Sequence, residues 1–205
     1  MRIVFFLSIA MLATLTAAGT ANATISGHVV ENAFSDLNTP PPADGPGHPS
    51  SDFTTNNINF YTGNSPSTTI GTFATLGTNF FNGQNGFSTN DLVTNTDWLF
   101  TGQTYLNAGA NSFVVGHDDG ALLDIPPFGR VVNVPGDNAF STTPFTVNAA
   151  TAGLYSFTLN FHENGNGPAG ITFQVNGAPV GVPEPATFAL LGAGLLGLGL
   201  LRRRA

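Results

Sequence analysis

Cysteine is absent from the 205-residue chain. Disulfide bonds, which stabilise many small proteins in oxidising surroundings, are therefore excluded. The fold must depend instead on the burial of apolar side chains or on a bound metal ion.

Basic residues are nearly absent as well. The chain has no lysine, and Arg130 is the one basic residue between positions 24 and 181. Eleven acidic residues lie in the same segment and give it a net formal charge of −10. Because binding to phosphates needs a basic surface, nucleic acid is excluded as a partner.

The middle of the chain also lacks a convincing helical period. Phenylalanine is abundant, at 18 of 205 residues, whereas charged residues make up only 8 %. Gly, Thr, Asn and Ser separate the apolar positions. This composition favours strands and turns over helices.

The first 23 residues are organised like a signal peptide. Arg2 precedes an apolar run over residues 3–15, and Ala21 and Ala23 form the small-x-small pattern that signal peptidase requires. We expect signal peptidase to cut after Ala23, so that the exported chain begins at Thr24.

The C-terminal end carries a second processing segment. Three features follow one another there: Val182-Pro183-Glu184-Pro185, an uncharged apolar run over 186–201, and the cluster Arg202, Arg203 and Arg204. As a helix, the 16-residue run would reach about 24 Å, slightly short of a bilayer core. The arginines would stay cytoplasmic, so we expect a transmembrane helix over 186–201 with everything upstream outside.

This tail, residues 182–205, resembles the PEP-CTERM sorting signal of Gram-negative bacteria, which the membrane transpeptidase exosortase recognises and cuts. The resemblance implies export across the inner membrane, transient anchoring, and release to the cell surface or extracellular matrix. Proteins with this signal are typically linked to exopolysaccharide and biofilm export. The alternative is an ordinary membrane anchor, although an anchor has no need of Pro-Glu-Pro at its outer edge.

Residues 24–181 are long enough for one domain with a sizeable core, and we expect an all-β fold, an antiparallel β-sandwich. The first predicted strand covers 25–31. The prolines between 35 and 51 have no backbone N–H to donate to a β-sheet hydrogen bond, so they predict an extended loop. Residues 53–95 are predicted to form short strands with long loops, in a register that the pattern leaves open.

The second half shows six short runs at the spacing of a sandwich: 112–116, 121–125, 130–134, 144–148, 154–161 and 170–176. Two of these runs alternate cleanly between apolar and polar residues, from Tyr155 to Phe161 and from Ile171 to Val175. One face of each strand is therefore expected in the core and the other in solvent.

Two segments between these runs carry the candidate site: Gly116-His117-Asp118-Asp119-Gly120 and His162-Glu163-Asn164-Gly165-Asn166-Gly167-Pro168. Calcium takes about six to eight hard oxygen ligands, which carboxylates, an amide and the carbonyls of a Gly-rich loop can supply. Successive side chains of an extended dipeptide point to opposite faces, so both aspartates can bind one ion only if the backbone is distorted. The alternative is a polar Asp-Asp-Gly turn without metal.

The order of motifs from Asp97-Trp98-Leu99-Phe100 through residues 113–123 to the Glu163-Asn164-Gly165 segment resembles a known family. It is similar to the β-sandwich domain of protective antigen and of the flocculin and GLEYA adhesins, most strongly over 97–176. The resemblance implies a calcium site with three sets of ligands: Asp118 and Asp119 joined by a cis peptide, the side chain of Asn164, and backbone carbonyls near Asn166 and Pro168. We place the adjoining His117 and Glu163 in the ligand-binding site.

Three classes of function follow. The first is a binding module that holds carbohydrate, such as exopolysaccharide, through calcium, and the second is a structural matrix protein in which the aspartates only stabilise a turn. The third is a glycosidase using Asp118 and Glu163, which would have to lie about 5 to 9.5 Å apart. No nucleophile elbow, phosphate loop or zinc spacing accompanies them, so we expect no enzyme.

The remaining candidates have simpler interpretations. His28 and His48 lie in unrelated segments and complete no metal-ligand spacing with His117 and His162. Trp98 is the one tryptophan of the chain. A single Trp in a sandwich is more often part of the core than a platform for sugar, and we expect it in the core.

Overall fold

The computed structural model describes residues 24–33, 37, 43–62, 67–74, 77–165 and 168–180. Ala21, Ala23, Asn166 and the whole segment 182–205, with the predicted helix over 186–201, lie outside these residues. Among the described residues, no helix has the length and apolar character needed to cross a membrane. All described strands belong to one compact unit, Ala21–Pro183, which carries its own core.

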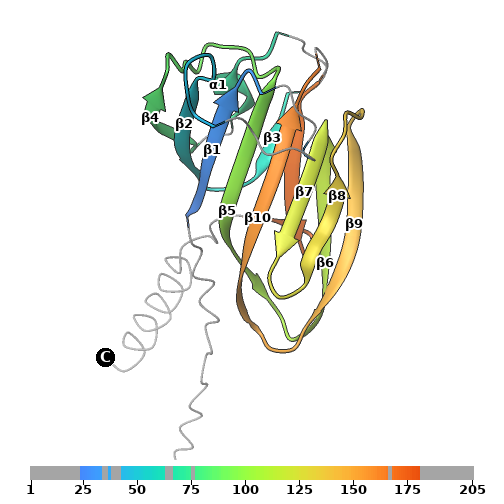
Figure 1. Cartoon of the computed structure of the whole chain (residues 1–205). Coiled ribbons are helices and arrows are strands. Elements are labelled where there is room, and N and C mark those ends of the chain that lie inside the picture. Colours follow the sequence, from blue (N-terminus) through green and yellow to red (C-terminus); the bar gives the residue numbers. More distant parts are fainter. Residues whose placement is uncertain are drawn as a thin grey trace, which may run out of the picture. The chain divides into compact units, whose positions relative to one another are not determined.

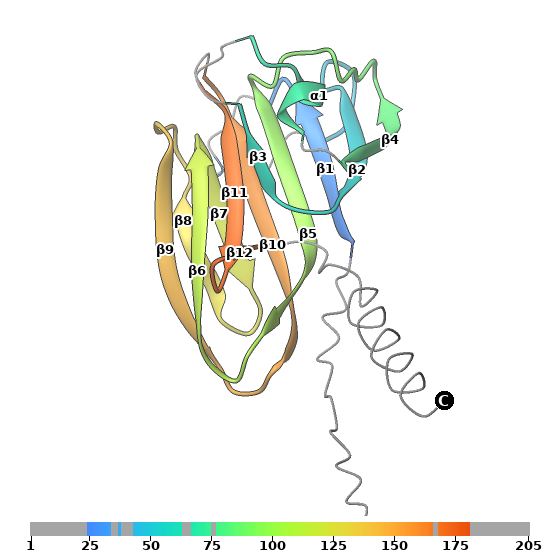
Figure 2. The same cartoon turned by 180° about the vertical axis from the view of Figure 1, so that it is seen from behind.

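Two antiparallel sheets pack face to face (Figures 1 and 2). The larger sheet has the order β4 (Asn79–Gln84), β2 (Ser50–Thr55), β1 (Ile25–Glu31), β5 (Thr96–Leu106), β10 (Gly153–Glu163), β7 (Gly120–Ile125) and β8 (Gly129–Val134). The smaller sheet contains β12 (Ala178–Pro179), β11 (Gly170–Val175), β6 (Gly109–Asp118) and β9 (Ser141–Ala149), and β3 (Asn59–Tyr61) also pairs with β11. The all-β antiparallel sandwich predicted from the sequence is therefore confirmed.

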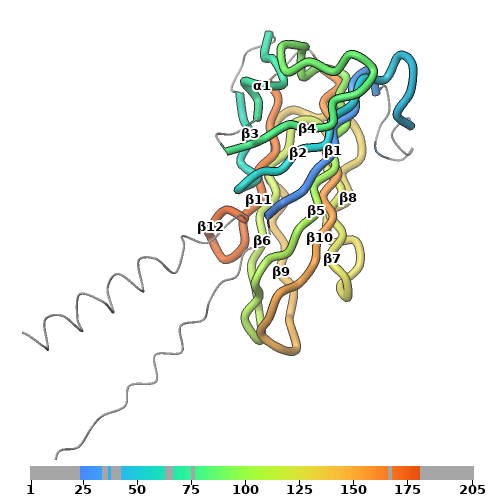
Figure 3. Tube along the Cα trace, turned by 90° about the vertical axis from the view of Figure 1, so that its left-hand side faces the viewer, coloured from blue at the N-terminus to red at the C-terminus, as the bar shows by residue number. Residues whose placement is uncertain are grey.

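The smaller elements lie at the margins of the sheets. Figure 3 shows the tight turn that joins β11 to β12 at one edge of the smaller sheet. The single described helix, α1 (Ile70–Phe73), begins after Thr69, whose hydroxyl accepts a hydrogen bond from the Thr72 backbone N–H. Ile70 and Phe73 of this helix are buried in the core.

The core is built from alternating inward residues of both sheets. In β10, Phe157, Leu159 and Phe161 are at most 2 % exposed, which confirms the predicted alternation. Trp98 of β5 is also in the core, at 1 % exposed, and its indole N–H donates to the Thr96 hydroxyl at 2.8 Å. Phe53 meets Trp98 edge to face at a centroid distance of 5.5 Å, a favourable arrangement of aromatic rings.

The predicted strand 25–31 is β1, and the six predicted runs of the second half correspond to β6 through β11. β5 was missed, because Asp97-Trp98-Leu99-Phe100 does not alternate and a glycine, Gly102, interrupts the strand. The loop was predicted to extend through residue 51, but Ser50 and Ser51 are the first two residues of β2.

Two further boundaries were wrong at the candidate site. His162 and Glu163 were expected in a loop, but β10 continues through Glu163. His117 and Asp118 likewise belong to β6. Both strands are therefore longer than their apolar runs, and they carry polar side chains into the buried end of the sandwich.

Candidate cation and ligand site

Three carboxylates converge at one end of the sandwich. Asp118 ends β6, Asp119 follows it directly, and Glu163 ends β10. One oxygen from each of these side chains lies within 4.8 Å of the other two. The residues are only 4 %, 7 % and 2 % exposed, respectively. The peptide bond between Asp118 and Asp119 is cis, as the family resemblance implied.

Asp119 is held by the backbone of two neighbouring loops. Its Oδ1 accepts a hydrogen bond from the Asn138 N–H at 3.1 Å, and its Oδ2 accepts one from the Asn164 N–H at 2.8 Å. Its own N–H donates to the carbonyl of His162 at 3.2 Å. The loop before β9 and the loop after β10 are thereby joined through one carboxylate, which fixes its position.

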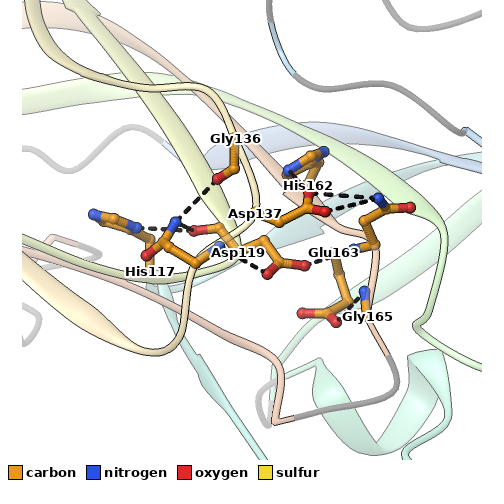
Figure 4. Close-up of polar contacts among 9 residues, drawn as sticks. His117, Asp119, Gly136, Asp137, His162, Glu163 and Gly165 are labelled. Carbon is orange, nitrogen blue, oxygen red and sulfur yellow. Dashed lines mark hydrogen bonds and ion pairs between the residues drawn. The ribbon is translucent and has the colours of Figure 1, made fainter.

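His117, two residues before this aspartate, is 1 % exposed. Its Nδ1–H donates to the Asp119 carbonyl at 2.9 Å (Figure 4), because a carbonyl can only accept. The Thr143 hydroxyl then donates to Nε2 at 3.1 Å. Both ring nitrogens are engaged within the protein, so His117 orients the backbone of Asp119. The ligand contact expected of His117 stays a prediction.

Two carboxylate oxygens of the cluster are buried without a hydrogen-bond partner, Asp118 Oδ2 and Glu163 Oε2. Glu163 Oε1 accepts from the Gly165 N–H at 3.1 Å, so only half of this carboxylate is satisfied by the protein. Arg130, the one basic residue of the exported segment, is paired with Asp124 at 3.0 Å. Burying unpaired carboxylate oxygens costs free energy unless a cation or a proton compensates them.

The electrostatics of the cluster favour the uptake of positive charge. Burial, together with the charges of Asp119 and Asp118, raises the pKa of Glu163 to about 9. Burial and the neighbouring Asp119 raise the pKa of Asp118 to about 6, opposed by a hydrogen bond from the Phe140 backbone. Each carboxyl group is therefore a place where a proton or a metal ion relieves the same repulsion.

A second group of possible metal ligands adjoins the first and shares Asp119. It contains Asp137 and His162, with His162 Nε2 at 3.4 Å from Asp137 Oδ1 (Figure 4). The Asn164 amide nitrogen donates to both oxygens of Asp137, at 3.2 and 3.4 Å. Asp137 and Asn138 were not among the predicted site residues, because they lie in a turn between β8 and β9 that carries no recognisable motif.

The structure thus gathers most of the predicted residues at one place. Asp118, Asp119, Glu163 and Asn164 adjoin one another, and Pro168 is half-buried just before β11. His28 lies elsewhere, bonded to Asp44 and Asp52 at 3.0 and 2.9 Å.

The residues of the cluster fit a hard divalent cation. The three convergent groups offer only carboxylate oxygens, two of them with unused lone pairs in a buried setting. Oxygen ligands suit calcium better than zinc, which prefers nitrogen and sulfur.

Comparison with known proteins identifies the tail and the fold. Residues 181–204 match the PEP-CTERM protein-sorting motif. This motif marks proteins for export and exosortase processing in Gram-negative bacteria, so the resemblance of the tail to this sorting signal is confirmed, while the membrane helix over 186–201 stays a prediction. No curated protein sequence shows a significant match to the chain.

Among solved structures, the PA14 domain of the MpAFP antifreeze protein is similar at a TM-score of 0.52 and 17 % identity, over 76 % of this chain and 81 % of that one. The sugar-binding PA14 domain of an RTX adhesin is similar at a TM-score of 0.47 and 16 % identity, over 78 % of this chain and 94 % of that one. A β-glucosidase from Kluyveromyces marxianus is similar at a TM-score of 0.46 and 10 % identity, over 74 % of this chain and 16 % of that one. The first likeness shows that the exported domain has a PA14-type β-sandwich fold.

Proposed function

We propose that the exported domain is a non-catalytic binding module whose cluster of Asp118, Asp119 and Glu163 holds one calcium ion. Bound calcium would supply open coordination positions for the hydroxyl groups of an extracellular carbohydrate. The proposal is carried by the two buried carboxylate oxygens that have no hydrogen-bond partner, Asp118 Oδ2 and Glu163 Oε2.

The remaining ligands would come from the segment that follows β10. The side chain of Asn164 and the backbone carbonyls near Asn166 and Pro168 are proposed to complete the set. The Asn164 N–H already bonds to Asp119, so this segment begins beside the cluster.

The surroundings of the domain support a calcium site. The sorting motif directs the protein out of the cytoplasm, and extracellular modules commonly bind calcium with dissociation constants of about 0.1 to 1 mM. A net formal charge of −10 over residues 24–181 attracts cations to the surface.

The same geometry argues against a glycosidase. Such an enzyme must place the scissile bond of its substrate between two carboxyl groups. Asp118 and Glu163 are grouped with a third carboxylate, Asp119, whose charge raises the pKa of both. This grouping suits a cation held by all three better than a sugar chain lying between two.

Thermal unfolding of residues 24–181 with calcium and with chelator tests the cation site. Calcium at 100 times its dissociation constant should stabilise the folded domain by about 2.7 kcal/mol if the unfolded chain does not bind it. Asp118→Asn should remove most of this gain. Asp44→Asn makes the same change of charge on a residue that pairs with His28 instead, and it should leave the gain intact. Identical curves with calcium and chelator would eliminate the site and favour a purely structural matrix protein.

A further inference from the structure

Two exposed aromatic residues touch each other on the outside of the smaller sheet. Tyr61 is 51 % exposed and Phe140 is 39 % exposed, and their ring centroids are 5.0 Å apart. Phe60, the preceding residue of β3, is fully buried. Because successive side chains of a strand point to opposite faces, Tyr61 points away from the core. Large apolar rings left at the surface in contact with each other are candidates for a binding surface.

Glycines form the floor beneath these rings. A Cβ atom at Gly170 would lie 2.7 Å from a Tyr61 ring carbon and 2.9 Å from a Phe140 ring carbon. A Cβ atom at Gly116 would lie 2.9 Å from Phe140 Cζ. Because both positions are glycine, the two rings lie directly on the backbone of β6 and β11, with their planes inclined at 60° to each other.

This aromatic platform, Tyr61 with Phe140, borders the carboxylate cluster. Tyr61 is opposite Gly170 in the register of β3 with β11, and Gly170 is opposite Asp118 in the register of β11 with β6. At about 4.8 Å between neighbouring strands, the Tyr61 backbone lies about 10 Å from that of Asp118. The Phe140 backbone lies near enough to the Asp118 carboxylate to oppose the rise of its pKa.

We propose that Tyr61 and Phe140 form a stacking subsite for a pyranose ring of the same carbohydrate that reaches the carboxylate cluster with its hydroxyl groups. This inference rests on the proposed function and adds the residues that would contact the apolar face of the sugar. The C–H groups of a pyranose face carry partial positive charge, which complements the negative face of an aromatic ring.

The charge of the cluster argues against an anionic occupant and is compatible with a neutral sugar. Asp118, Asp119, Glu163 and Asp137 lie together beside the platform, and an acidic peptide or an anionic polymer would be repelled by them. A neutral pyranose carries no charge to be repelled, and its hydroxyls can approach a cation held by the cluster.

Saturation-transfer NMR on residues 24–181 tests the platform. The probes are methyl glycosides of glucose, galactose, mannose and N-acetylglucosamine, together with cellobiose, each with calcium and with chelator. Tyr61→Ala and Phe140→Ala should each weaken binding of the sugar that binds by about five- to tenfold. Tyr61→Phe should retain binding because the ring face remains. Leu154→Ala, which removes an apolar side chain of matching exposure (42 %) at the opposite end of β10, should have no effect.

The results separate this inference from the function on which it rests. If a sugar binds in calcium and both alanine variants bind it as tightly as the wild type, the platform is overturned and the cation-dependent module stands. If none of these sugars binds although calcium stabilises the domain, both the carbohydrate function and the platform are contradicted. If Tyr61→Ala loses the sugar but keeps the full thermal shift in calcium, the platform is supported as a site distinct from the metal ligands.

Discussion

At the scale of single residues, burial decides the charge of Glu163. Its folded pKa, about 9, is raised above the ordinary value of 4.5. Its contribution to stability is therefore fully present below about pH 4.5 and is lost as the pH rises toward 9. Glu163→Gln, which keeps an oxygen for the Gly165 N–H, should stabilise the domain in chelator at pH 8 by about 2 kcal/mol.

In calcium the same substitution should act against stability, because it removes one of the three proposed ligands. The thermal shift that calcium gives the wild type should therefore be mostly absent in Glu163→Gln. Urea denaturation in calcium and in chelator measures both effects. A variant that keeps the whole calcium shift would exclude Glu163 from the ligand set.

Glu31 provides a pH test that does not involve the cluster. Burial and the neighbouring Asp91 raise its pKa from 4.5 to about 7, and its Oε1 is buried without a hydrogen-bond partner. Stability from this group is complete below about pH 4.5 and is lost as the pH rises through 7. In chelator, Glu31→Gln should stabilise the domain at pH 8 by about 2 kcal/mol and change it little at pH 5. An equal effect at both pH values would contradict this assignment.

At the scale of elements, β10 organises the larger sheet because it pairs with β5 on one side and β7 on the other. Phe157 in this strand is 2 % exposed and meets Phe173 of the facing sheet edge to face at 5.2 Å. Phe157→Ala should destabilise the domain by about 3 to 5 kcal/mol, because it leaves a cavity between the sheets.

The matched control lies on the same strand. Leu154 is 42 % exposed, and Leu154→Ala should change the free energy of unfolding by less than about 1 kcal/mol. Denaturant titration of the two variants compares the two faces of β10. Similar losses in both would mean that the strand is not buried on one face only.

How far the elements could be predicted depends on how regular their patterns are. β10 and β11 alternate between apolar and polar residues, which a local reading of the sequence detects. β5 has buried residues on both faces, Trp98 and Phe100 on one and Asp97 on the other. Its sequence therefore shows no alternation, and the strand was missed. The polar ends of β6 and β10 were assigned to loops for the same reason.

At the scale of the whole molecule, two processing events should define the mature protein. The sorting motif over 181–204 marks the tail for exosortase, and the N-terminal pattern predicts a cut after Ala23. Mass spectrometry of exported material should therefore find a chain that begins at Thr24 and has lost Arg202, Arg203 and Arg204. Exported protein that still carries these arginines would contradict processing at the tail.

The sequence alone determined the features that depend on neighbouring residues. The sorting tail, the signal-peptide pattern, the all-β class and the adjacent aspartates Asp118 and Asp119 are all contiguous or periodic in the chain. Such signals are readable because each strand contributes its own two-residue period and each processing enzyme recognises one short segment.

Only the tertiary structure decided how the site is composed. Glu163 joins the aspartates, Asp137 adjoins them and the buried His117 bonds to the Asp119 backbone, because β6 and β10 end, and β7 begins, at the same end of the sandwich. Tyr61 meets Phe140 because β3, β11 and β6 bring distant residues into one row. Sheet register joins residues that are many positions apart, and it is set by the packing of the whole core, which no local pattern contains.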